Sequence, residues 1–114
     1  MTSQNDRGYT LEMHGIMASE DPEWVEKYNA FIQATYTGQR LLDRKTKELL
    51  QIAVETALRA DQDQIQAHMR VALREGATPR EILEALEAVA MPMGGLAFRR
   101  GLQAWAAETG WQAN

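Results

Sequence analysis

The chain has 114 residues, of which 45% are hydrophobic and 25% charged. These proportions are average for a globular protein, and they exclude a disordered tail, a collagen-like fibre and a membrane span. We expect a single domain over residues 1–114, with the polar residues 1–8 frayed. Because so short a chain cannot enclose a large active site, we expect a second copy to contribute part of the lining of any pocket.

Charge and cysteine content exclude further classes. Twelve Lys and Arg residues against sixteen Asp and Glu residues leave a net charge of −4, with no basic stripe, so nucleic acid is not an expected partner. The chain has no cysteine, which excludes disulfides, thiol nucleophiles, iron–sulfur clusters and thiolate zinc sites. The N-terminus lacks an apolar signal region, so we expect a cytoplasmic protein without a membrane partner.

The first two predicted helices have clear start signals. Asp21-Pro22-Glu23 combines an N-cap acceptor, a proline at the first helical position and an acid near the positive helix end. This helix ends at Thr37-Gly38-Gln39, and Asp43 caps the next one. The second helix carries an apolar band wider than a surface helix needs, which predicts a central position. Its members are Leu49, Leu50, Ile52, Ala53, Val54, Ala57 and Leu58.

Three further helices are predicted downstream. One begins near Asp61 and stops at Gly76, with Ile65, Met69 and Ala72 on its apolar side. Thr78-Pro79-Arg80-Glu81 is a complete capping box, and it starts a helix that Pro92 and Gly94-Gly95 then break. The last runs from about Leu96 to Gly110 and presents Leu102, Trp105 and Ala106. No stretch alternates as a strand does, so the predicted fold class is all-α.

His68 is the main candidate for chemistry. It lies three residues after Ile65 and four before Ala72, on or at the edge of the apolar face of its helix. An imidazole in that position must be hydrogen-bonded. Two interpretations stay open: a core histidine satisfied by a carboxylate or carbonyl, and a catalytic or ligand-binding group.

Other polar residues could join His68. Gln64 and Asp61 precede it on one helical stripe, which could form a site, although Asp61 could also serve only as a cap. Glu48 could face His68 and orient its ring, or it could be an exposed partner of Arg44 or Lys45.

A metal site is not expected. Asp61, Asp63, His68 and Glu48 are suitable ligand types, but no pair of ligands occurs at H-x-x-x-H or E-x-x-H spacing on one helix. His14 and the methionines are assigned no function.

Several segments in order resemble the carboxymuconolactone decarboxylase family, which includes the AhpD-like proteins. They are LDRKTKELL at residues 42–50, His68-Met69-Arg70, REGATPREI at residues 74–82 and Glu84-Ala85-Leu86, within a resemblance that covers residues 42 to about 106. The resemblance implies an AhpD-like helical bundle of about five to six helices. It also implies a homo-oligomer, a trimer or a hexamer, with active sites near subunit interfaces.

The family divides by chemistry. Its peroxidase and disulfide-reductase branch has a C-x-x-C-x-x-x-H pattern, and Asp61 and Gln64 stand where the two cysteines would be. Without a thiol there can be no dithiol relay, so that activity is excluded. The chain is similar to the cysteine-free branch, that of gamma-carboxymuconolactone decarboxylase. This similarity implies a cofactor-free carboxy-lyase for a small carboxylated lactone or related acid, 4-carboxymuconolactone-like, in aromatic or related small-acid metabolism.

Such chemistry assigns roles to the candidates. Loss of CO2 from an unsaturated lactone leaves a dienolate, which needs a cation for the carboxylate, a donor for the lactone oxygen and an acid for the carbon. We expect His68 to be the acid and Glu48 to orient it, with substrate contacts from Gln64, Asp61 and Arg44. Arg99 and Arg100 are alternative cations, whereas Arg70 points to the opposite side of its helix.

One alternative stays open. It is a non-catalytic or isomerase-type oligomeric paralogue that binds a small organic acid, with His68 only as a hydrogen-bonding group of the core.

Overall fold

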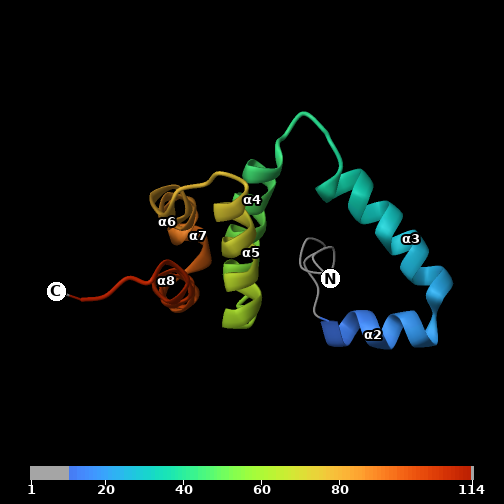
Figure 1. The fold of residues 1–114 in the computed structure, drawn as a ribbon. Coiled ribbons are helices and arrows are strands. Elements are labelled where there is room, and N and C mark those ends of the chain that lie inside the picture. Colours follow the sequence, from blue (N-terminus) through green and yellow to red (C-terminus); the bar gives the residue numbers. More distant parts are fainter. Residues whose placement is uncertain (1–10, 114) are drawn as a thin grey trace.

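The computed structural model describes residues 11–113, and within them it contains only helices and connecting segments (Figure 1). The all-α prediction is therefore confirmed. The elements are α2 (Leu11–Glu20), α3 (Pro22–Ile32), the π-helical turn η1 (Gln33–Thr37), α4 (Arg44–Ala57), α5 (Gln62–Arg74), α6 (Pro79–Ala88), α7 (Ala90–Met93) and α8 (Gly95–Thr109). The frayed segment predicted at residues 1–8 lies outside the described residues.

No helix within residues 11–113 is both long enough and apolar enough to cross a bilayer.

Local capping explains where the helices begin. The side chains of Asp21, Asp43 and Thr78 each accept a hydrogen bond from a backbone N–H three residues later, at 3.1, 2.8 and 3.0 Å. Thr78 N–H in turn donates to Glu81 Oε1 at 2.9 Å, which completes the predicted capping box. Asp61 occupies the N-cap position of α5, but its side chain makes no capping bond.

Two helices differ from the prediction. The helix α2 was not expected, because the segment Leu11–Glu20 has little amphipathic periodicity. The break after α6 falls at Val89, before Pro92, which lies inside the single-turn helix α7. A proline in a first helical turn removes no hydrogen bond, so it does not end that helix.

The core lies between α4, α5, α6 and α8. Its fully buried large side chains are Ile52, Ile65, Met69, Ile82 and Leu86. The helix α8 presents small residues to this core, namely Ala97, Gly101 and Ala104, while the residues predicted for its face, Leu102, Trp105 and Ala106, are half-buried beside them. Small residues let the backbone of α8 approach closely, since a Cβ on Gly101 would lie 2.7 Å from Thr56 Cγ2.

The helices α2 and α3 form an arm that stands apart from α4–α8, and the molecule measures 49 × 30 × 26 Å along its principal axes (Figure 1). The turn η1 follows α3 directly, and residues 38–43 then lead to α4. The arm therefore meets the helical core through η1, which carries one of the residues described next.

Candidate active site

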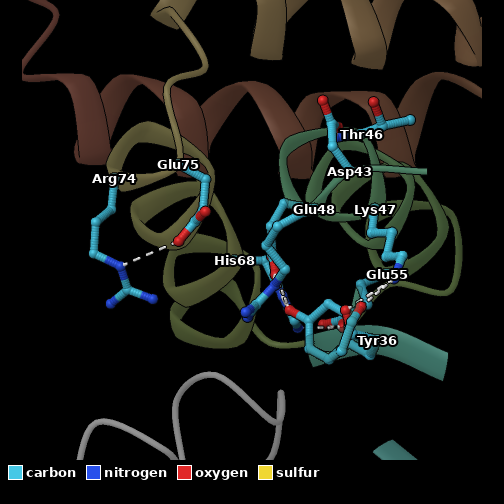
Figure 2. Close-up of polar contacts among 11 residues, drawn as sticks. Tyr36, Asp43, Thr46, Lys47, Glu48, Glu55, His68, Arg74 and Glu75 are labelled. Carbon is cyan, nitrogen blue, oxygen red and sulfur yellow. Dashed lines mark hydrogen bonds and ion pairs between the residues drawn. The ribbon is translucent and has the colours of Figure 1, made fainter. Parts of the chain in front are cut away.

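A buried polar cluster lies where η1, α4 and α5 meet. The turn η1 contributes Tyr36, α4 contributes Arg44, Glu48 and Glu55, and α5 contributes His68. Figure 2 shows the side chains of Tyr36, Glu48, Glu55 and His68 converging on one another. We call these five residues the His68 cluster.

Glu48 is the first carboxylate partner of His68. His68 Nδ1 lies 2.8 Å from Glu48 Oε1, and both residues are almost completely buried, at 1% and 0% exposure. A buried carboxylate at this distance holds the ring in one orientation and stabilises its charged form. Glu48 also accepts a hydrogen bond at Oε2 from Arg44 Nε at 2.9 Å. The two sequence interpretations of Glu48, as a partner of His68 and as a partner of Arg44, thus both describe real contacts.

Glu55 approaches the other ring nitrogen. Its Oε2 lies 2.8 Å from His68 Nε2, close enough for an ion pair, but the two groups are not aligned as a hydrogen bond. Glu55 Oε1 also has no hydrogen-bond partner among the described residues. The Glu55 side chain is 17% exposed, whereas His68 is closed off, so this is the side of the ring nearest to solvent.

Tyr36 completes the cluster on the Nδ1 side of His68. Its hydroxyl donates to Glu48 Oε2 and lies 3.2 Å from His68 Nδ1. The guanidinium of Arg44 stacks over the Tyr36 ring, with Cζ 4.4 Å from the ring centroid. This cation–π contact stabilises the charged guanidinium. Glu48 therefore accepts from a phenol and a guanidinium while it contacts the imidazole.

The π-helical turn is held in place by a buried lysine. Lys47 Nζ donates to the backbone oxygens of Tyr36 and Gly38, at 3.2 and 3.1 Å. The N–H of Gly38 donates to Gln33 O at 2.8 Å, and a Cβ on Gly38 would lie only 2.3 Å from that oxygen. Glycine is therefore required where η1 ends, and Lys47 binds the carbonyls that a helix end leaves free.

The surroundings raise the pKa values of His68 and Tyr36, as they do for Arg44. Burial lowers the pKa of His68, but the hydrogen bond to Glu48 and the negative charges of Glu48 and Glu55 close to the ring outweigh burial and raise it to about 9. Burial, together with the hydrogen bond and charge of Glu48, raises the pKa of the Tyr36 hydroxyl. At neutral pH the ring of His68 is an imidazolium and Tyr36 is a neutral phenol.

The cluster is thus a proton donor held between two carboxylates. An imidazolium that is held by Glu48 at Nδ1 and has a misaligned carboxylate at Nε2 can release a proton from Nε2. The guanidinium of Arg44 balances the second carboxylate charge, which lowers the cost of burying these groups together.

The structure separates the other predicted site residues. Asp61 is exposed at the first end of α5, and Gln64 is half-buried one turn before His68. Arg70 pairs with Glu108 at 2.9 Å, away from the cluster, while Arg99 and Arg100 lie on α8. Within the described part of the chain, no group of three or more potential ligands is arranged to hold a metal ion.

Sequence reasoning missed two members of the cluster. Glu55 follows Glu48 by seven residues, which is two helical turns, so the spacing alone could have placed both on the face toward α5. Tyr36 had no such signal, because it comes from a different element, 32 residues before His68.

Comparison with known families gives one match. The sequence pattern of the Carboxymuconolactone decarboxylase family matches residues 22–107, well over half of the chain. The match begins earlier than residue 42, so it includes α3 and η1 with Tyr36. No curated protein matches the chain significantly.

Proposed function

The chain belongs to the carboxymuconolactone decarboxylase family, and from this we propose that it is a cofactor-free carboxy-lyase for a small carboxylated lactone or related acid, of the kind of 4-carboxymuconolactone. The cysteine-free composition supports the decarboxylase branch over the thiol-dependent one. We further propose that His68 is its general acid.

The protonation of His68 carries this proposal. Its ring has a carboxylate oxygen 2.8 Å from each nitrogen, which keeps it charged at neutral pH. Buried polar atoms are nearly always hydrogen-bonded, yet His68 Nε2 and Glu55 Oε1 have no aligned partner within residues 11–113. A polar substrate group that displaces Glu55 Oε2 from Nε2 would give both atoms a partner.

The reaction balances without a cofactor. The bond between the carboxylate and the adjacent carbon breaks and releases CO2, and the electron pair moves into the conjugated lactone carbonyl to form a dienolate. His68 Nε2 then donates its proton to carbon, and the electron pair returns from oxygen to form the new C–H bond. Solvent protonates the ring again, while Glu48 holds its orientation from Nδ1.

The other proposed contacts follow from position. Arg44 binds Glu48 through Nε, and its side chain is 17% exposed, so its guanidinium is the cation that we assign to the substrate carboxylate. Asp61 and Gln64 lie at the N-terminal end of α5, the helix that carries His68, and would contact the far end of the substrate.

One observation favours a second candidate function. His68 and Glu48 are buried as deeply as core residues, which suits an oligomeric protein that binds a small acid without turning it over. In that case the cluster would only stabilise the junction of η1, α4 and α5.

A measurement of CO2 release distinguishes the two. Purified protein is offered 4-carboxymuconolactone and a panel of related lactones and β-keto acids, beside His68→Ala and, as a matched control, His14→Ala on α2. We expect release by the wild type and by His14→Ala, and none by His68→Ala with an unchanged helical circular dichroism spectrum. Release that persists in His68→Ala, or no release from any substrate by the wild type, would contradict the proposal.

A further inference from the structure

A second polar site is lined by residues outside the His68 cluster. A hollow of about 420 Å³ opens between the α4–α5 connection and the first half of α8. It is lined by Arg59, Gln62, Leu96, Arg99, Arg100 and Gln103. No member of the His68 cluster lines this hollow.

The positive charge of the hollow has no negative counterpart among residues 11–113. Arg59 and Arg99 form no ion pair with any residue of the part that the structure describes, and Arg100 donates only to a backbone oxygen, Ala60 O, at 3.3 Å. Other arginines of this acidic chain do pair, for example Arg70 with Glu108 and Arg80 with Glu84. Three guanidinium groups gathered around one hollow without a carboxylate among its lining residues repel one another, and an anion would relieve that repulsion.

The lining also fits an anion chemically. Besides the guanidinium groups it contains the amides of Gln62 and Gln103, and Leu96 is its only apolar residue. Guanidinium groups bind carboxylate and phosphate oxygens through two parallel N–H donors, and amides add neutral donors. A wall that is mostly polar favours a compact, charged ligand over an aromatic one.

The turn that ends α4 places Arg59 at the hollow. Arg59 adopts a positive φ of 61°, a conformation that costs a non-glycine residue energy. Its N–H donates to Thr56 O at 3.0 Å, and Ala60 N–H donates to Glu55 O at 2.9 Å, so the turn is hydrogen-bonded and ordered. This turn carries Arg59 to the hollow and sets Ala60 O where Arg100 donates.

We propose that this hollow binds a small anion with at least two negative charges, a di- or tricarboxylate or a phosphate. The site is separate from the His68 cluster, so its occupation does not depend on the reaction proposed there. Carboxylates and phosphate both present negatively charged oxygens, which can reach more than one arginine of the hollow.

Isothermal titration calorimetry tests this with two probes, citrate and inorganic phosphate, at low ionic strength. The proteins are the wild type, Arg99→Gln, the double variant Arg59→Gln/Arg99→Gln, and Arg80→Gln. The last is the matched control, since it removes one positive charge from an exposed arginine of α6 outside the hollow. All three substitutions lie at exposed positions, so the fold should be preserved.

We expect the wild type and Arg80→Gln to bind at least one of the two probes, citrate or phosphate, and to do so saturably. Binding should weaken at least about tenfold in Arg99→Gln and further in the double variant, because each guanidinium contact to an oxyanion is strong. Binding of citrate alone would identify a polycarboxylate site, and binding of phosphate alone a phosphate site, and each supports the proposal.

Three results would overturn it: no saturable binding of either probe, equal weakening in Arg80→Gln, or unchanged binding in the double variant. The molecular mass of each protein in solution is measured in parallel. If the hollow variants lose oligomer mass and the wild type binds neither probe, the arginines serve a contact between copies and not an anion.

Discussion

At the scale of single residues, His68 is defined by a carboxylate at each ring nitrogen. Glu48 lies against Nδ1 and Glu55 against Nε2, both at 2.8 Å. Burial by itself would favour the neutral ring and lower the pKa of His68. The two carboxylates favour the charged ring more strongly, so the pKa is raised. The charged state that lets His68 act as the proposed acid is therefore stabilised by Glu48 and Glu55.

This gives a prediction about pH. The pKa of His68 rises from 6.5 to about 9 on folding, so the stabilising charge is fully present below pH 6.5 and is lost as the pH rises through 9. The free energy of unfolding of the wild type should fall by up to about 3 kcal/mol over that range. In Glu55→Gln the pKa of folded His68 should be lower, so the fall should still begin near pH 6.5 but should end at a lower pH and be smaller.

Urea unfolding at a series of pH values, with the His68 ring followed by NMR, measures both quantities. Glu84→Gln, which changes an exposed carboxylate of α6, is the control and should follow the wild type. A His68 pKa that is the same in Glu55→Gln and the wild type would show that Glu55 does not act on the ring.

At the scale of elements, α4 carries most of the site and part of the core. Glu48 and Glu55 lie two turns apart on the face toward α5, and Ile52 between them is fully buried. The neighbouring helix α8 is placed by its small residues, since Gly101 lies directly against Thr56 and Leu86. The close contact between α4 and α8 thus supports the helix that holds both carboxylates.

A pair of glycine substitutions tests this contact. In Gly101→Ala the new Cβ would lie 2.7 Å from Thr56 Cγ2 and 3.0 Å from Leu86 Cδ2, and both side chains are fully buried. Overpacking of this kind costs about 1–3 kcal/mol, which outweighs a gain of up to about 1 kcal/mol from replacing a helical glycine. We expect Gly101→Ala to lower the melting temperature.

Gly15→Ala is the matched control, because nothing lies within 4 Å of a Cβ at that position of α2. It should leave the melting temperature unchanged or raise it slightly. A Gly101→Ala protein as stable as the wild type would mean that α8 can move away from α4 at little cost.

At the scale of the whole molecule, α4 has a second apolar face that no other element within residues 11–113 covers. Leu50, Val54 and Leu58 are spaced four residues apart and are 52, 55 and 75% exposed. These residues belong to the band that predicted a central helix, so within one chain that prediction holds only for the opposite face. We propose that a second copy covers this stripe, which together with the projecting α2–α3 arm suits a homo-oligomer, a trimer or a hexamer.

Val54→Glu tests this proposal. A charge in the middle of the stripe would be buried in an interface, and burying it unpaired would disfavour association. We expect the molecular mass measured by light scattering after size exclusion to fall toward 12.8 kDa, the mass of one chain. Met91→Glu, at a 93% exposed position of α7, should keep the wild-type mass. A wild type that is already monomeric would contradict the proposal.

Much of the fold followed from local sequence. The starts of α3, α4 and α6 are set by side chains three residues from the N–H groups that they bind, so Asp21, Asp43 and Thr78 could be recognised without any tertiary contact. The face of α5 that carries His68 followed from helical periodicity in the same way. The helix α2 escaped prediction because its apolar residues do not gather on one face.

The site was only partly predictable. His68, Glu48 and Arg44 were identified as candidates, but the sequence left open whether Glu48 contacts the imidazole, the guanidinium or both. Glu55 was within reach of the spacing argument. Tyr36 was not, since its position depends on the π-helical turn and on Lys47, which binds the carbonyls of Tyr36 and Gly38.

By itself, the sequence determined the fold class, the capped helix starts and the absence of thiol chemistry, because each depends on composition or on interactions within one helical turn. Only the tertiary structure decided which groups surround His68, which face of α4 is left exposed and that three arginines share one hollow. These features join residues far apart in the chain, such as Glu48 and His68 or Arg59 and Arg99. Their distances depend on how whole helices pack, and helical periodicity says nothing about that.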